Sequence, residues 1–425
     1  MSAMTEPLNT QLNIKLNTKL DAGVDKVSAV KPRAAQRLLQ MPSFSIKSLD
    51  GYLLTACAGL IAVGLVMVAS SSFAVAVDLG VSPFHYLIRH TVALAIGLCL
   101  AFWLNQIPLE EIEKRSLPLF IFALGLLVLP WIPGLGVRTN GALRWIRLGI
   151  TNFQVVEAAK LLMILYLAGY CVRQRNQLFE QWKGILKPLG MVGIMVLMLL
   201  PQPDFGSAAL LLAVCFTLLW LAGARASYLI VLLILGVLVM MAIAVAEPYR
   251  LQRLIGFVDP WKDQYASGFQ LTQALIAIGR GEIFGVGLGE SVQKLHYLPE
   301  AHSDFIVAVI AEELGLAGLV LVLGLFCLLA ARTFELGARA MNQGLNYAGL
   351  VAFGIGLWFS IQCIVSVGVN LGLLPTKGLT LPLISSGGSS MMITVAALGL
   401  LFNISRRVNA KVTAPRATFA ANPSA

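Results

Sequence analysis

The sequence is short of charge. Only 12% of its residues are Asp, Glu, Lys or Arg, whereas a soluble domain has about 25%, and the mean hydropathy is +0.81. This composition excludes an ordinary soluble enzyme and indicates an integral membrane protein. The net charge of +10 does not indicate a nucleic-acid partner, because the basic residues lie beside apolar runs, where they set membrane orientation and contact anionic lipid.

Cysteine and histidine are also scarce. The six cysteines lie within apolar runs or at the end of one, which predicts free thiols and excludes a disulfide framework. No cleavable signal peptide is apparent, because the first apolar run begins only after about fifty polar residues. We expect that first run to serve as an uncleaved membrane anchor.

Long apolar runs dominate the remainder of the chain. A helix needs about 20 apolar residues to span the hydrocarbon core, and ten candidates are present. They lie near residues 51–73, 87–105, 117–134, 155–173, 187–201, 206–222, 228–247, 304–330, 346–367 and 386–404. The sequence therefore predicts an all-α polytopic membrane protein with about ten transmembrane helices.

The charge pattern predicts the orientation and the domains. An even number of spans puts both termini on one side, and the basic tails and the basic loops after spans four, six and eight all fall there. That side is therefore expected to be cytoplasmic. We expect a disordered tail at 1–47, with a partner-binding segment as the alternative, a transmembrane domain at 48–405 and a second cytoplasmic tail at 406–425.

A large external loop is expected between spans seven and eight. It is about 55 residues long, which is too long for a simple connector. Arg250 and Arg253 lie three residues apart in 249–257, a spacing that predicts an amphipathic helix in the membrane interface. Residues 268–277 predict a short helix that re-enters the membrane.

The end of this loop concentrates ionisable residues. Asp304 directly precedes span eight and follows Lys294, His296, Glu300 and His302. A short acidic side chain at a helix start commonly caps backbone N–H groups, so both capping and chemistry are open for Asp304. Its ionisable neighbours favour chemistry, because charged groups at membrane depth are costly and usually functional.

Three more carboxylates fall within or between apolar runs. Glu312 and Glu313 lie about 12 Å further along span eight and either pair with bases, line a polar cavity or stay protonated. Pairing is the favoured interpretation. Asp204 lies in the break between spans five and six, either as a helix cap or as a cavity-lining partner for a base, and capping is favoured.

Other external segments offer polar contacts. Residues 140–141 are Asn-Gly, which predicts a tight turn, and Arg144 follows beside a tryptophan, either as an interfacial anchor or as an anion contact. Lys377 is the only formal charge between spans nine and ten, so it either snorkels to the surface or binds an anion. Ser385 begins a Gly/Ser-rich stretch, 385–390, where the backbone can approach a ligand closely.

These motifs, in this order, resemble the SEDS family of membrane-embedded peptidoglycan glycosyltransferases. The resemblance covers roughly residues 50–405. It rests on segments 140–145, 201–206, 249–253, 268–273, 297–305 and 375–390. The run 375–382 resembles the division-type branch, and the elongation-type branch is the alternative.

The resemblance implies an inverting enzyme that polymerises lipid II into nascent glycan on the outer face of the bacterial cytoplasmic membrane, at the division septum. Asp304 falls on the essential aspartate of the family, which implies a general base. The resemblance leaves room for a divalent cation. The expected substrate-binding residues are Arg144, Arg250, Arg253, Lys294, Glu300, His302, Lys377 and Ser385.

The resemblance also implies protein partners, namely a class B penicillin-binding transpeptidase and regulatory membrane proteins of the division machinery. A lipid II flippase that uses Asp204, Glu312 and Glu313 as an intramembrane path is the alternative function. The charges gather at the outer mouth and are sparse in the inner half of the spans, which favours the enzyme. A scaffold for division proteins is a third hypothesis.

Overall fold

The computed structural model describes residues 50–413, except 140–141, 149–150, 246–256, 258, 263, 266–267, 296 and 376–377. Three of the expected substrate contacts, Arg250, Arg253 and Lys377, lie outside the described residues, as do the tail at 1–47 and most of the amphipathic segment at 249–257. The hypotheses about them stay predictions.

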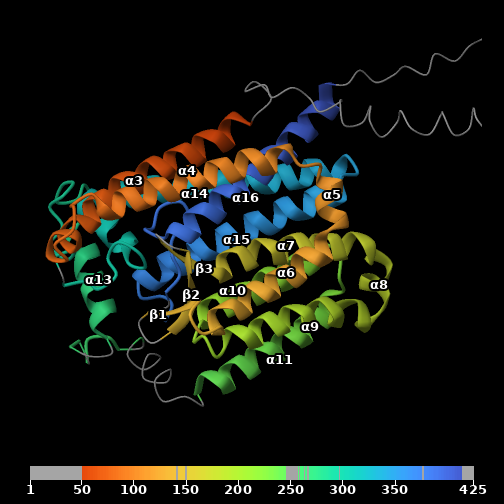
Figure 1. Cartoon of the computed structure of the whole chain (residues 1–425), viewed down its shortest axis with the longest axis horizontal. Helices are drawn as coiled ribbons and strands as arrows, with labels where there is room; N and C mark the ends of the chain where they lie inside the picture. Colours follow the sequence, from red (N-terminus) through yellow and green to blue (C-terminus); the bar gives the residue numbers. More distant parts are fainter. Residues whose placement is uncertain are drawn as a thin grey trace, which may run out of the picture. The chain divides into compact units, whose positions relative to one another are not determined.

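Apolar helices build the described part of the chain (Figure 1), and each predicted span overlaps one of them. They are α3 (Gly51–Asp78), α4 (His85–Gln106), α6 (Ser116–Val128), α7 (Val155–Arg173), α9 (Trp182–Leu199), α10 (Phe205–Leu221), α11 (Ala226–Val245), α14 (Ile306–Asn342), α15 (Asn346–Asn370) and α16 (Gly388–Thr413). Seven of the described helices are long and apolar enough to cross a membrane, and α6, α10 and α11 contain shorter apolar stretches. The helical membrane-protein fold is confirmed, whereas the number of spans stays a prediction.

The helices approach one another closely where small residues meet. In Figure 1, α16 lies along α4, and α14 lies beside α3 and α15. A Cβ atom on Gly399 of α16 would lie 2.4 Å from the Cα of Ala101 in α4. Glycine therefore allows backbone contact here, as is common between membrane helices.

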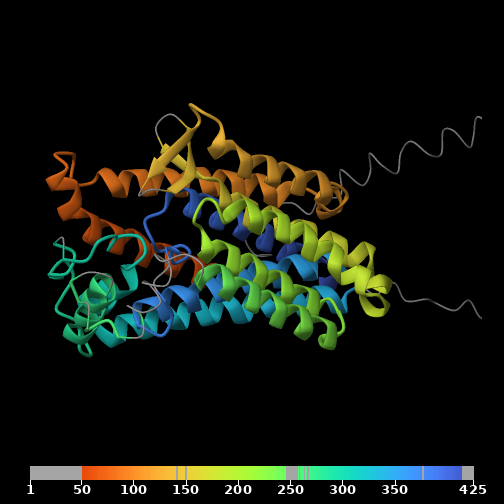
Figure 2. The same cartoon turned by 90° about the horizontal axis from the view of Figure 1, so that it is seen from below.

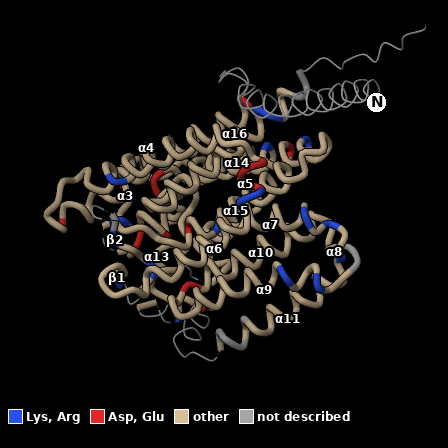
Figure 3. Tube along the Cα trace, turned by 45° about the vertical axis from the view of Figure 1, so that its right-hand side comes forward, with Lys and Arg blue, Asp and Glu red and all other residues tan. Residues whose placement is uncertain are grey.

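The charged residues lie mainly at helix ends and in loops, with a few inside the bundle (Figure 3). At one end, Arg332 pairs with Asp50 at 2.8 Å and Arg407 pairs with Glu110 at 2.7 Å. These arginines lie on the face predicted to be cytoplasmic. The polar segments that lead to Asp304 connect the opposite helix ends, and the assignment of the two faces to cytoplasm and exterior stays a prediction.

A small sheet, which the sequence analysis did not predict, connects α6 to α7 through the 3-10 turn η2 (Leu129–Trp131) (Figure 2). Its antiparallel strands are β1 (Gly136–Thr139), β2 (Ala142–Leu148) and β3 (Thr151–Gln154), in the order β1-β2-β3. Thr139 pairs with Ala142. The tight turn predicted at residues 140–141 lies outside the described residues.

Three short helices complete the described elements: α5 (Leu109–Lys114), α8 (Arg175–Glu180) and α13 (Phe269–Arg280). The short helix predicted at 268–277 is confirmed as α13, which packs against α14 and α15. Its re-entry into the membrane stays a prediction.

Helix α14 is interrupted at Gly315, whose φ of 65° and ψ of −165° are not helical. The preceding loop pairs with the backbone at the break. Val286 N–H donates to Glu312 O at 2.9 Å, and Leu316 N–H donates to Glu282 O at 2.9 Å. The backbone groups that the break would otherwise leave unpaired are therefore satisfied by the loop, as burial requires.

We expect Gly315→Ala to destabilise the protein by about 2 kcal/mol or more. Alanine would have to adopt the positive φ of residue 315, which L-residues rarely do. Its Cβ atom would also lie 2.4 Å from Gly285 N and 2.5 Å from Ile283 O. Gly324→Ala in the same helix is the matched control, because its Cβ meets nothing within 4 Å, and it should stabilise by about 0.5–1 kcal/mol. Thermal unfolding in detergent measures both, and equal melting temperatures would contradict the strain at Gly315.

Candidate active site at the start of α14

Asp304 lies in the turn that directly precedes α14, where its N–H donates to Glu300 O at 3.1 Å. The N-cap residue of α14 is Phe305, whose side chain makes no capping bond. Asn370 Oδ1 at the end of α15 accepts the N–H of Ala308 at 3.0 Å. For Asp304, capping and chemistry both stay predictions.

A second polar segment packs against this turn. Ser386 N–H donates to the carbonyl of His302 at 2.9 Å. A Cβ atom on Gly378 would lie 2.9 Å from Asp304 Oδ2, so the backbone at residue 378 approaches the carboxylate as closely as only glycine allows. Residues 300–304 and 378–386, which are far apart in the sequence, therefore meet around Asp304.

Glu300 and His302 lie in the same turn as Asp304. Glu300 is exposed, has a φ of 57° and accepts a hydrogen bond from Ser303 Oγ at 2.7 Å. The His302 ring centroid is 5.1 Å from that of Tyr86, and its buried Nδ1 has no hydrogen-bond partner in the described part of the chain. Burial lowers the pKa of His302, with Glu300 acting in the opposite direction, and this favours the neutral imidazole.

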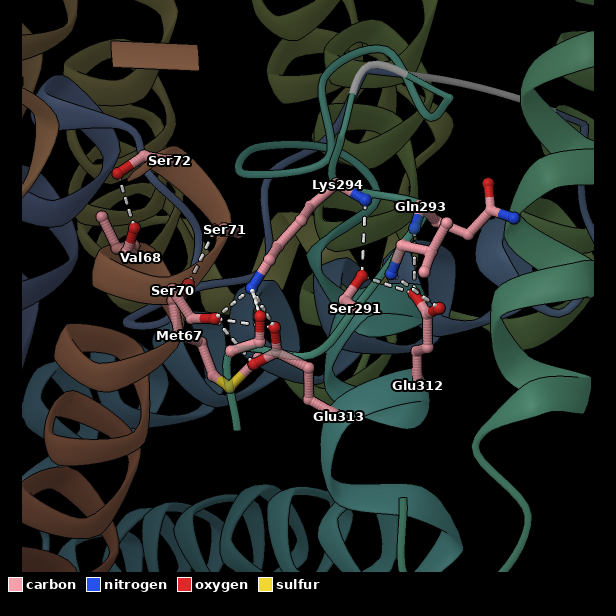
Figure 4. A network of polar contacts seen from close by, with 12 residues as sticks. Met67, Val68, Ser70, Ser71, Ser72, Ser291, Gln293, Lys294, Glu312 and Glu313 are labelled. Carbon is pink, nitrogen blue, oxygen red and sulfur yellow. Dashed lines mark hydrogen bonds and ion pairs between the residues drawn. The ribbon is translucent and has the colours of Figure 1, made fainter. Parts of the chain in front are cut away.

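Lys294 is buried in an ion pair at the break in α14 (Figure 4). Its ammonium Nζ is 2.7 Å from Glu313 Oε1 and also donates to Gly289 O at 2.7 Å and to Ser70 Oγ at 3.0 Å. An ammonium group has three N–H donors, and each has a partner here. This geometry favours a structural role for Lys294 over the substrate contact expected from the sequence.

Glu312 is held in a second buried network (Figure 4). Its carboxylate pairs with Arg280 at 3.2 Å, accepts the Val292 N–H at 3.1 Å and accepts the Ser291 hydroxyl. The predicted pairing of Glu312 and Glu313 with basic residues is confirmed. Each pair ties the loop before Asp304 to α14.

Asp204 is the N-cap of α10, where its buried carboxylate accepts the Ser207 N–H at 3.2 Å. The favoured structural interpretation of Asp204 is thus confirmed. The three carboxylates of the flippase hypothesis therefore all make local structural bonds, which disfavours an ion path built on them.

Arg144 and Ser385 also bond within the protein. Arg144 Nε donates to Gln202 O at 2.7 Å and Nη2 donates to Pro203 O, so the side chain joins β2 to the turn before α10. Ser385 is buried, and its Oγ accepts the Leu381 N–H at 2.7 Å. Ser385 therefore shapes the segment that lies against Asp304, and its contact with substrate stays a prediction, as does that of Arg144.

Sequence reasoning missed a buried ion pair in α7. Lys160 Nζ is 2.9 Å from Glu157 Oε1 and 3.1 Å from Gln362 Oε1, and it lies 5.2 Å from the Trp358 ring centroid. Gln362 Nε2 donates to Thr380 O at 2.7 Å, which connects the pair to the segment beside Asp304. The available signal was two opposite charges three residues apart inside an apolar run.

In the described residues, no three His, Cys, Asp or Glu side chains converge in a way that would hold a metal ion. The divalent cation that the resemblance leaves open stays a hypothesis.

We expect Lys294→Met to destabilise the protein by about 3–5 kcal/mol, because it leaves the buried Glu313 carboxylate without its cation. Lys114→Met is the matched control, since Lys114 and Glu111 form an exposed pair with side chains 71% and 45% exposed, and it should cost less than about 1 kcal/mol. Thermal unfolding of the purified proteins measures both. A similar small loss in the two variants would refute the structural role of Lys294.

Comparison with known proteins places the chain in a family. A family model described as a cell cycle protein, FTSW_RODA_SPOVE, matches residues 52–410. The chain belongs to this family. Its relatives include the probable peptidoglycan glycosyltransferases FtsW of Xanthomonas oryzae, 51% identical over 84% of this chain and 72% of the relative, and of Coxiella burnetii, 47% identical over 84% and 96%. The SEDS resemblance and its division-type assignment are thereby confirmed.

Solved structures agree. A chain from a peptidoglycan synthase complex that coordinates polymerization and crosslinking matches with a TM-score of 0.69 and 31% identity, over 85% of this chain and 98% of that one. The rod shape determining protein RodA of Thermus thermophilus matches with a TM-score of 0.63 and 30% identity, over 86% and 98%. The chain is a multi-pass membrane protein of this fold.

Proposed function

We propose that this division-type SEDS protein is a peptidoglycan glycosyltransferase that polymerises lipid II on the outer face of the cytoplasmic membrane, with Asp304 as the general base. The observation that supports the base assignment is the position of Asp304. It lies in the turn that directly precedes α14, where residues 300–304 and 378–386 meet.

The proposed reaction is a direct displacement. The carboxylate of Asp304 accepts the proton of the 4-hydroxyl of GlcNAc in the incoming lipid II, and the oxygen attacks the anomeric carbon of the growing glycan. A β-1,4 bond forms as the α bond to undecaprenyl diphosphate breaks, and the diphosphate departs with the bonding electrons. Base and leaving group therefore act on opposite faces of the sugar.

The diphosphate requires positive charge more than it requires a proton. Lys377 is one candidate, because it is the only formal charge in the sequence between Arg339 and Arg406. Arg144, Arg250 and Arg253 are the other candidates. Lys294 is the weakest of the expected cations, because Glu313 already neutralises it.

His302 lies two residues from Asp304, and burial lowers its pKa, which favours the neutral imidazole. A cation beside Asp304 would hold the carboxylate ionised but weaken it as a base, whereas a neutral imidazole does not. We propose that His302 and the exposed Glu300 contact sugar hydroxyls near the reacting centre, and that Ser385 shapes the same wall.

We further propose that the protein works with a class B penicillin-binding transpeptidase and with regulatory membrane proteins at the division septum. The likeness to a chain from a complex that coordinates polymerization and crosslinking supports the first partner, and the names of the relatives support the septal location.

We expect Asp304→Asn to lower lipid II polymerisation by about 10²- to 10⁴-fold, because asparagine cannot accept the proton. Asp204→Asn is the matched control and should stay within about threefold of the native rate, since asparagine caps a helix as well as aspartate does. The assay uses the purified protein, with and without the cognate transpeptidase, and labelled lipid II.

Native-rate polymerisation by Asp304→Asn would refute the base assignment. Movement of lipid II across reconstituted vesicles without any polymer would instead support the flippase.

A further inference from the structure

We propose that Asn370 is a positioning residue for the reaction, because its side-chain amide sets the orientation of the peptide that carries Asp304. This inference rests on the proposed role of Asp304 as the base. Asn370 is the last residue of α15, and its side chain is completely buried.

The side-chain amide of Asn370 makes three hydrogen bonds, two as a donor and one as an acceptor. Nδ2 donates to the carbonyl of Asp304 at 3.1 Å and to the carbonyl of Ser366 at 2.8 Å. Oδ1 accepts the N–H of Ala308 at 3.0 Å. The bond to Ser366, one turn back on the same helix, holds the amide in place, so the other two bonds have fixed directions.

These two bonds bracket the start of α14. Its N-cap residue, Phe305, has no polar side chain and makes no capping bond, whereas Asn370 supplies from α15 an acceptor for the Ala308 N–H, as a capping residue does. At the same time it holds the carbonyl between Asp304 and Phe305. A side chain that only accepts or only donates cannot make both contacts, which explains why an amide is present.

The geometry on the other side of Asp304 makes this orientation important. The carboxylate lies so close to residue 378 that even a Cβ atom there would be only 2.9 Å away. A rotation of the 304–305 peptide would press the carboxylate against this backbone or move it away from the acceptor hydroxyl. Displacements of about 1 Å can change a rate about 100-fold.

The test uses Asn370→Ala and Asn370→Leu in the full-length protein. Leucine has a similar size, so it removes the hydrogen bonds while leaving little cavity. We expect kcat for lipid II polymerisation to fall about 10- to 100-fold with KM changed less than about threefold, because substrate binding is retained while the base is misplaced.

Asn403→Ala is the matched control. Asn403 is another buried asparagine whose Nδ2 donates to two backbone carbonyls, those of Leu104 at 3.0 Å and Ile107 at 2.8 Å, at the opposite end of the bundle. Asn403→Ala should lower the melting temperature about as much as Asn370→Ala does, and it should leave kcat within about threefold of the native value. Native kcat in both Asn370 variants, or loss of folding in both while Asn403→Ala folds, would overturn the positioning role.

A double-mutant cycle separates this inference from the base assignment. If Asn370 acts through Asp304, adding Asn370→Ala to Asp304→Asn should lower the remaining rate by less than about twofold, whereas a general structural defect would lower it as much as in the native background. If Asp304→Asn alone keeps the native rate, the proposed function fails. If it is inactive while the Asn370 variants are normal, only the positioning role fails.

Discussion

The need to pair buried backbone groups controls the end of the helix bundle that carries Asp304. A break in a buried helix leaves N–H and C=O groups without partners, and each costs about 1–3 kcal/mol if it stays unpaired. At Gly315 the loop at 282–287 meets this need by bonding both sides of the break. The ion pairs of Glu312 with Arg280, which is 44% exposed, and of Glu313 with the buried Lys294 hold the chain on either side of this loop. The chain that leads to Asp304 is therefore anchored before it reaches the site.

Helix α15 organises the site from the other side. Two of its side-chain amides reach out of the helix, Gln362 to the carbonyl of Thr380 and Asn370 to the turn at Asp304. Because the two contacts start from one rigid element, they set the two polar segments relative to each other. The buried pair of Lys160 with Glu157 extends this support to α7. Asp304, the proposed base, thus lies in a turn, whereas the side chains that hold the surrounding backbone lie on helices.

Some of this could be predicted from the sequence, and the reasons are local. The ten apolar runs predicted the helices because the length and hydropathy of a run are enough to identify a membrane helix. The capping role of Asp204 and the short helix α13 were predictable from the residues next to them in the sequence. The pairing of Glu312 and Glu313 with basic residues was predictable because an unpaired charge inside an apolar run is energetically costly. The partners themselves depend on folding: Asn370 looks like an ordinary residue near the end of an apolar run, and its contact with Asp304 spans 66 positions. The strands of the sheet are four to seven residues long, too short for a clear alternating pattern.

The interruption at Gly315 has a mechanical consequence. A continuous helix transmits bending along its whole length through its hydrogen-bond ladder. In α14 that ladder stops at the glycine, so residues 306–314 form a short stub separate from the long segment at 316–342. The loop at 282–287 bonds to the backbone on both sides of the glycine, so it joins the stub to the long segment in place of the missing ladder. Forces on the long segment in the lipid bilayer therefore reach the stub through this loop, and the bond of Ala308 to Asn370 ties the stub to α15.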